Sequence, residues 1–133
     1  SEKKDSNTMR ELLIDNDLIA RCRAEEATLT EVRCVLRNQL LRSGLADIDV
    51  PGQLQSCRLI TDKDGSTSLV GEWRRQRGRV IGSVVIHENG ELFAELGVLQ
   101  PAPNNPRMRV ESVVAFGEAG ALHTELRMTP ARD

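Results

Sequence analysis

The spacing of apolar residues changes along this chain, from a helical period in the first third to a period of two in the remainder. The helical pattern is clearest over residues 28–44, where Thr28 and Glu31 form a capping box and Gly44 gives an end signal. The apolar positions of this segment fall on one helix face: Leu29, Val32, Val35, Leu36 and Leu40. The pattern therefore predicts an amphipathic helix that ends at Gly44.

A weaker helical pattern precedes this helix. Thr8 and Glu11 match a second capping box, and apolar residues then recur at roughly helical spacing. The polar residues 15–17 interrupt the apolar stripe, so we expect the first helix to bend or break there. Residues 1–7 are polar and are predicted to form a disordered tail. Both helices are therefore placed within residues 8–44.

After Pro51 the apolar residues alternate, as in β-strands. The most specific turn signals are residues 62–65 and Asn89-Gly90. The predicted strands span residues 54–61, 66–73, 79–87, 92–99, 107–116 and 121–128. Two helices packed on a coiled antiparallel meander predict a single α+β domain over residues 8–133, with its sheet over residues 54–128. This order of elements is similar to cystatin-like and NTF2-like folds, and the resemblance is one of architecture and not of sequence motif.

The Asn89-Gly90 turn predicts which residues face one another across the hairpin. A two-residue type I′ turn, the form that Asn-Gly favours, pairs Val84 with Glu95 and Gly82 with Gly97. In that register apolar residues occupy both faces of the hairpin instead of alternating with polar ones. Monomers rarely expose large apolar patches. We therefore expect the second face to be covered by a second copy of the chain, by curling of the sheet into a half-barrel, or by a ligand.

The second face of this hairpin is the predicted binding surface. Its residues are Gly82, Val84, Phe93, Glu95, Gly97 and Leu99. The two facing glycines would leave a slot, which indicates either a bend in the sheet or room for a ligand. Glu95 has apolar predicted neighbours, and such desolvation would suit a carboxylate to acid–base chemistry. The structural alternative is an ion pair between Glu95 and an arginine of the next strand, Arg109.

Four arginines gather just before the hairpin: Arg74, Arg75, Arg77 and Arg79. Nucleic-acid binders combine such a cluster with aromatic residues on which bases stack, but the only aromatic residue near this one is Trp73. The 133-residue chain has a formal net charge of −2, so no global charge attracts nucleic acid or anionic lipid. We therefore expect the cluster to be an exposed loop, with Arg-mediated RNA or DNA binding as the alternative.

The remaining candidates for chemistry are few. His87 is expected at the rim of the sheet and His123 in a solvated row on the last strand. Cys22, Cys34 and Cys57 are odd in number and widely spaced, so they are expected to be buried and reduced instead of forming a disulfide framework. The sequence contains no zinc-ligand spacing, nucleophile motif or phosphate-binding loop, and we expect neither a metal nor a cofactor.

No apolar segment reaches the roughly 20 residues of a membrane span, and the N-terminal sequence SEKKDSNT lacks the apolar core of a signal peptide. A cytoplasmic protein without membrane association is therefore expected. The leading interpretation is a small binding or adaptor module, rather than an enzyme, that acts as a homodimer through a sheet face. The second is a nucleic-acid-binding protein. The third is a small-ligand carrier or enzyme that uses the glycine slot and Glu95.

Overall fold

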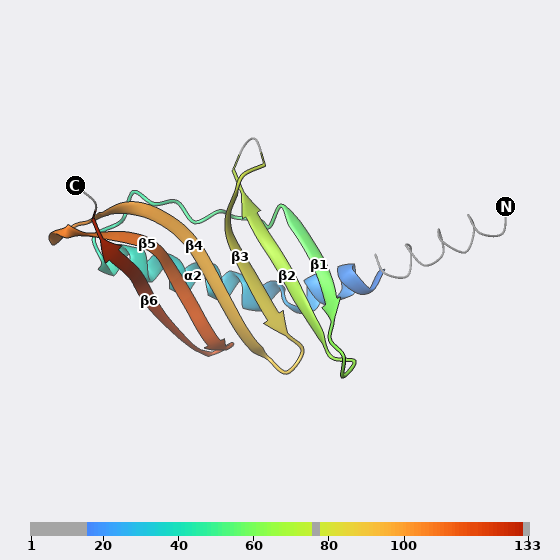
Figure 1. Cartoon of the computed structure of the whole chain (residues 1–133). Coiled ribbons are helices and arrows are strands. Elements are labelled where there is room, and N and C mark those ends of the chain that lie inside the picture. Colours follow the sequence, from blue (N-terminus) through green and yellow to red (C-terminus); the bar gives the residue numbers. More distant parts are fainter. Residues whose placement is uncertain (1–15, 76–77, 132–133) are drawn as a thin grey trace, which may run out of the picture.

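The computed structural model describes residues 16–75 and 78–131, which form two helices and six strands (Figure 1). Residues 16–24 are helical, and after a turn at Glu25 helix α2 spans Glu26–Arg42. The strands are β1 (Ser56–Thr61), β2 (Thr67–Arg74), β3 (Val80–His87), β4 (Glu91–Ala102), β5 (Asn105–Glu118) and β6 (Ala121–Pro130). The predicted α+β class is confirmed.

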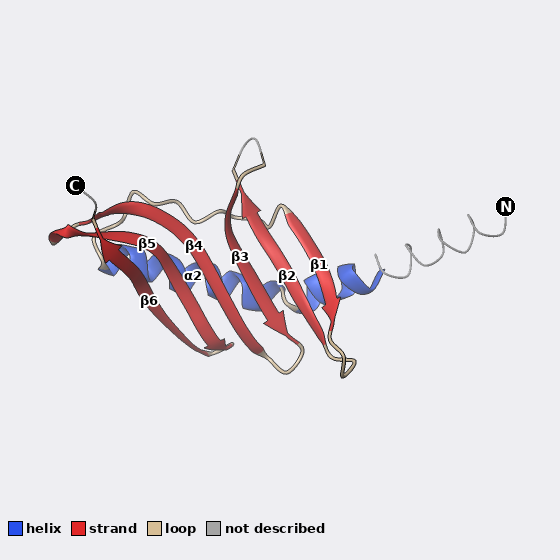
Figure 2. Ribbon diagram, in the orientation of Figure 1, coloured by secondary structure: helices blue, strands red, loops and turns tan. Residues whose placement is uncertain are grey.

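The six strands form one antiparallel sheet in which each strand pairs with the next along the chain, in the order β1-β2-β3-β4-β5-β6. The sheet is open, with β1 and β6 at its edges. Both helices lie on the same side of it (Figures 1 and 2), and α2 packs against β5 and β6. We call the side that faces α2 the inner face and the opposite side the outer face.

The hydrophobic core lies between α2 and the inner face. Helix α2 contributes Val32, Leu36 and Leu40, which recur every four residues and are at most 1% exposed. The strands contribute alternate residues, as a sheet with one buried face requires: Leu69, Trp73, Val84, Ile86, Leu92, Ala94, Leu96, Val113 and Ala115. Since each large apolar side chain contributes about 1.5–3 kcal/mol when it is buried, this layer holds the fold together.

The predicted end of α2 at Gly44 is confirmed, but its predicted start at Thr28 is wrong. Gly44 adopts a left-handed conformation (φ 76°), and its N–H bonds the carbonyl of Leu41, as expected for a helix that ends at glycine. Thr28 does not cap the helix, because it lies inside α2, which begins at Glu26 without a side-chain cap.

The first helix runs into α2 with only a turn between them. Residue 16 is already helical, so within the described residues the break occurs at Glu25 and not at the predicted polar residues 15–17. Arg21 forms an ion pair with Glu25 (3.1 Å) and donates a hydrogen bond to the carbonyl of Ile86 (3.0 Å), which ties this helix to β3. The predicted tail and first capping box lie outside the described residues.

Strands β4 and β5 extend past their predicted ends into the proline-rich segment 100–106. The pairing of β3 with β4 ends at Gly82 and Leu96, so the C-terminal part of β4, which includes Pro101, is not paired with β3. Pro101 is therefore tolerated in the strand, because its missing N–H breaks no hydrogen bond to β3.

The β3–β4 hairpin has a different register from the predicted one. Val84 pairs with Ala94 and not with Glu95, a shift of one residue. Because side chains alternate along a strand, a one-residue shift moves every β3 side chain to the opposite face. Val84 therefore lies on the inner face, Ser83 takes the position opposite Glu95 that was predicted for Val84, and Val85 lies opposite Phe93 on the outer face.

The turn explains the shift. A type I′ turn needs a positive φ at both Asn89 and Gly90, and only Gly90 has one (97°). The loop consists of three residues, Glu88 to Gly90, and is closed by a hydrogen bond from the Gly90 N–H to the His87 carbonyl (2.9 Å). The prediction that both faces of the hairpin are apolar is therefore wrong: β3 turns its two polar residues, Ser83 and His87, outward.

Candidate functional site: the outer face of the sheet

One row of apolar side chains crosses the outer face. The pairing places Val70 of β2 beside Val85 of β3, Val85 beside Phe93 of β4, and Phe93 beside Phe116 of β5. We call these four residues the apolar row. Val85 and Phe93 are 37% and 38% exposed, and Val70 and Phe116 are half-buried. Figure 1 views this face, and no described helix or loop crosses it.

Polar side chains flank the apolar row on both sides. One neighbouring row contains Glu72, Ser83 and Glu95 and continues to the buried Val114 of β5. The other contains Ser68 and His87 and begins at Ile60 of β1, which is 39% exposed. An apolar centre inside a polar rim is the usual anatomy of a protein–protein interface. The outer face therefore has the composition of a docking surface and not of a second core.

The residues predicted to form the binding surface do not share one face. Phe93, Glu95 and Gly97 lie on the outer face of β4, but Gly82 and Val84 lie on the inner face of β3, where Val84 is fully buried. The sequence interpretation placed Val84 opposite Glu95, where Ser83 lies, and did not include Val85 in the surface. It also missed Val70 and Phe116, which join the surface from neighbouring strands.

The predicted slot between Gly82 and Gly97 does not form, for the same reason. Gly82 pairs with Leu96, so it does not face Gly97. A Cβ atom at Gly82 would lie 2.9 Å from Cε3 of Trp73 and 2.7 Å from the carbonyl oxygen of Glu95. The space that this glycine leaves is filled by the indole ring and the neighbouring strand. Gly82 therefore allows tight packing inside the protein and does not create a ligand site.

Glu95 is held by two side chains on the outer face. Its Oε2 accepts a hydrogen bond from Oγ of Ser112 at 2.6 Å and lies 3.5 Å from Nη1 of Arg127. Arg127 also lies over Phe93, with its Cζ 5.4 Å from the ring centroid. An arginine partner was predicted, but it is Arg127 of β6 and not Arg109. These contacts favour the structural interpretation of Glu95 over acid–base chemistry.

The end of the sheet that carries the β2–β3 loop, which we call the basic end, is rich in arginine. Its charged residues are Arg74, Arg75, Arg79, Arg107, Arg109, Arg127, Glu72, Glu95, Glu111 and Glu125. Arg77 of the predicted cluster lies outside the described residues. Sequence reasoning missed the contribution of β5, because Arg107 and Arg109 are about thirty residues away along the chain and reach this end only through the antiparallel pairing.

Two features of the basic end are fixed by contacts within the chain. Nη2 of Arg74 lies 2.9 Å from Oε1 of Glu72. Hydrogen bonds from Arg74 and Ser56 hold the pKa of the Glu72 carboxyl below its usual value. Trp73, the aromatic residue nearest the arginines in sequence, is 1% exposed on the inner face. It therefore offers no platform on which a nucleic-acid base could stack.

The opposite end of the sheet, which we call the acidic end, carries the β1–β2, β3–β4 and β5–β6 turns. Its charged residues are Asp62, Lys63, Asp64, Glu88, Glu91 and Glu118. Hydrogen bonds from Ser66 hold the pKa of Asp64 below its usual value, because they stabilise the ionised carboxylate. Opposite charges are therefore separated along the strand direction.

Leu99 has an unusual backbone at the basic end. Its φ of 55° lies in the left-handed region, and it belongs to a bulge of β4 between Gly97 and Gln100. The side chain is 47% exposed, and the carbonyl accepts a 3.4 Å hydrogen bond from Arg109. Leu99 separates two open hollows of about 330 and 870 Å³ on this end of the molecule.

The histidines and cysteines do not assemble a reactive centre. His87 is a rim residue, as predicted, with Nε2 3.2 Å from Oγ of Ser66. Cys34 is exposed, so the expectation that all three cysteines are buried is wrong, and Cys22 and Cys57 are half-buried. Burial, reinforced by the neighbouring Cys22, raises the pKa of the Cys57 thiol to about 11. That thiol is therefore a poor nucleophile at neutral pH.

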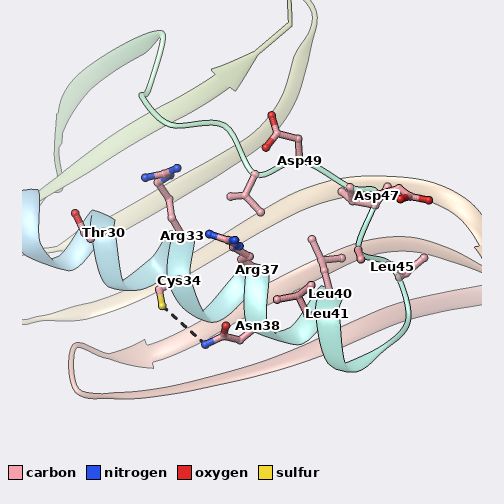
Figure 3. Close-up of a pocket in the computed structure, with 13 residues that line it drawn as sticks. Thr30, Arg33, Cys34, Arg37, Asn38, Leu40, Leu41, Leu45, Asp47 and Asp49 are labelled. Carbon is pink, nitrogen blue, oxygen red and sulfur yellow. Dashed lines mark hydrogen bonds between the residues drawn. The ribbon is translucent and has the colours of Figure 1, made fainter.

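A separate hollow of about 630 Å³ lies between α2 and the connector that follows it (Figure 3). Arg33 and Arg37 extend from α2 toward the connector, which contributes Asp47 and Asp49. Nε of Arg33 donates a 2.7 Å hydrogen bond to the carbonyl of Pro51. The hollow carries charges of both signs and therefore selects no single class of ligand.

Over residues 16–75 and 78–131, no three His, Cys, Asp or Glu side chains are grouped so that they could hold a metal ion. In the same part of the chain, neither helix has the length and apolar character that crossing a membrane requires. Comparisons of the chain with known protein families, with curated proteins and with solved structures find no match.

Proposed function

We propose that this protein is a binding module that acts as a homodimer, with the outer face of the sheet as the contact surface. The observation that carries the proposal is the apolar row, which crosses four strands on a face that no described element covers. Its exposed members, Val85 and Phe93, are large apolar side chains at the centre of a polar surface. Such patches mark sites of protein–protein contact.

The size of the face supports this use. Six strands about 4.8 Å apart and about 20–46 Å long present roughly 900 Å². Each partner in a standard protein–protein interface contributes about 800 Å². Two outer faces can also stack as the sheets of a β-sandwich do, about 10 Å apart with their side chains interdigitated. The outer face is therefore large enough to pack against a second copy of itself.

The alternative functions have less support. The hypothesis of an enzyme or carrier depended on a slot at Gly82, and Trp73 fills that space. The arginines of the basic end still support nucleic-acid binding. Single-strand binders also need exposed aromatic residues on which bases stack, and Trp73 is buried.

The oligomeric state in solution tests the proposal. At micromolar concentration, size-exclusion chromatography with light scattering should give twice the monomer mass for the wild type. Val85→Lys should give the monomer mass, because a lysine on each copy would face the partner's apolar row. Leu41→Lys is the matched control. Leu41 is 50% exposed on α2, away from the outer face, and this variant should remain dimeric. A wild-type monomer, or loss of the dimer in the control alone, would overturn the proposal.

A further inference from the structure

The smaller hollow at the basic end, of about 330 Å³, opens where strands β3 and β4 separate. The pairing of the two strands ends at Gly82 and Leu96, and beyond that point β4 bends away from β3 (Figure 1). Residues of the β2–β3 loop, of the start of β3 and of the β4 bulge line the hollow. It therefore differs from the slot that was predicted at Gly82, which Trp73 fills.

The charges that line this hollow have one sign. Among the described residues that line it, Arg75 and Arg79 are the only ionisable ones, and within residues 16–75 and 78–131 neither forms an ion pair. The larger hollow at the same end contains both Arg109 and Glu111, and the hollow beside α2 contains two arginines and two aspartates. Of these three hollows, the one between β3 and β4 therefore selects its ligand by charge, and it selects an anion.

The other walls of this hollow are mainly apolar. Val80 and Leu99, which are 43% and 47% exposed, line it together with Ile81 and Val98. A ligand with an apolar part would remove exposed side chains from water, and this favours binding through the hydrophobic effect. The left-handed backbone of Leu99 (φ 55°) is a second sign of function, because strained residues of this kind cluster at ligand-binding sites.

We propose that this hollow binds a small amphiphilic anion, with the anionic group at Arg75 and Arg79 and a short aliphatic chain against Val80 and Leu99. Guanidinium groups bind carboxylates and phosphates through charge-assisted hydrogen bonds. The volume of the hollow lies near the lower limit of the range for small-molecule sites, about 300–1,000 Å³, so the ligand is short. One chain supplies the whole lining, so this site goes beyond the proposed homodimer and does not depend on it.

Nuclear magnetic resonance titration of ¹⁵N-labelled protein tests the proposal, because it detects weak binding and also locates it. The probes are hexanoate and hexyl phosphate, which carry the two head groups that an arginine pair recognises. At least one of them should bind with a dissociation constant in the millimolar range and shift the amide signals of residues 79–81 and 97–100. The absence of a saturable shift with both probes up to about 50 mM, or shifts centred on the apolar row, would overturn the proposal.

Two further compounds separate the contributions of charge and chain. Acetate has the charge without the chain, and 1-hexanol has the chain without the charge. Each should bind at least about fivefold more weakly than the better of the two probes. If acetate binds as well as hexanoate, the apolar walls contribute nothing, and if 1-hexanol binds as well, the arginines contribute nothing. Either result would refute an amphiphilic ligand.

Matched arginine variants separate the hollow from the general charge of the basic end. Arg79→Gln should weaken binding of the anion at least about fivefold, because it removes one of the two charges in the hollow. Arg107→Gln removes the same charge from an exposed position at the same end, outside the lining of the hollow, and should change the dissociation constant by less than about twofold. Equal losses in both variants would show that the anion responds to the charge of the whole end, and the proposed site would be wrong.

Discussion

The two faces of the sheet are built from the same strands but leave very different amounts of apolar surface to solvent. Val84 and Val85 are adjacent in β3, yet the first is fully buried and the second is 37% exposed. On the inner face α2 covers the alternate apolar residues, whereas on the outer face no described element covers the apolar row. The difference between the faces therefore comes from the position of the helix and from the register, which turns the polar Ser83 and His87 outward and the apolar residues inward.

The comparison separates the residues that stabilise the fold from the residues that are available for binding within one sheet. The apolar residues of the inner face are buried against α2 within the same chain, so they explain why the domain folds. The outer face contributes less to folding and carries an apolar centre and an ordered arrangement of charges. Residues that are exposed in the monomer and conform to such a pattern are the ones on which binding is expected to depend.

The largest expected difference between the faces is seen by truncating the two valines. Val84→Ala should lower the free energy of unfolding by about 2 kcal/mol, because it removes two buried methyl groups and leaves a cavity. Val85→Ala should change it by less than about 0.5 kcal/mol in the monomer. Urea denaturation of both variants at a concentration where the chain is monomeric measures the difference. Equal losses would mean that the assignment of faces in β3 is wrong.

Much of this architecture could be predicted from the sequence. The change from a helical period to a period of two placed two helices before six strands, and Gly44 marked the end of α2. Turn signals such as residues 62–65 separated the strands correctly, since local backbone preferences decide where a strand must stop. Strand ends were less accurate, because β4 and β5 continue through a proline-rich segment where only the pairing reveals that proline is harmless.

The candidate site was predicted less well because one turn type determined it. Asn-Gly is compatible both with a two-residue loop and with a three-residue loop in which only the glycine has a positive φ. The alternation of β3 contained a signal for the second: placing Ser83 and His87 toward solvent gives a cleaner polar face than the chosen register did. Contacts between distant segments, such as the pair of Glu95 with Arg127, had no local signal at all.

A smaller effect is expected from the thiol on the inner side of β1. Burial next to Cys22 raises the pKa of Cys57 from 9.0 to about 11. A pKa that is higher in the folded protein favours folding while the thiol is protonated, so this contribution is complete below pH 9 and is lost as the pH rises toward 11.

Chemical denaturation at several pH values between 8 and 11 measures this loss. Wild type should lose more stability over this range than Cys57→Ala, because the variant has no thiol to ionise there. Cys34→Ala is the matched control, since Cys34 is exposed on α2, and it should follow the wild-type curve. If Cys57→Ala follows the wild-type curve as well, the thiol does not lie in the buried environment that the inner face provides.

The smallest expected effect concerns Leu99, the one non-glycine residue with a positive φ within the described ranges. A left-handed backbone costs a residue such as leucine about 1–2 kcal/mol, whereas glycine adopts it without strain but loses about 0.5–1 kcal/mol more conformational entropy on folding. Leu99→Gly should therefore raise the free energy of unfolding by about 0.5 kcal/mol in urea denaturation. Leu99→Ala retains the strain and should show no gain.

Leu99 is 47% exposed and has a strained backbone, so under the proposed homodimer its side chain is expected to contact the partner. Leu99 lies at the basic end beside Arg109. Leu99→Gly should then stabilise the monomer and weaken dimerisation in the same preparation, a trade between stability and binding that functional surfaces commonly show. If Leu99→Gly stabilises the monomer and leaves the dissociation constant of the dimer unchanged, the contact surface does not extend to the basic end. The outer face would then be limited to the apolar row and its polar rim.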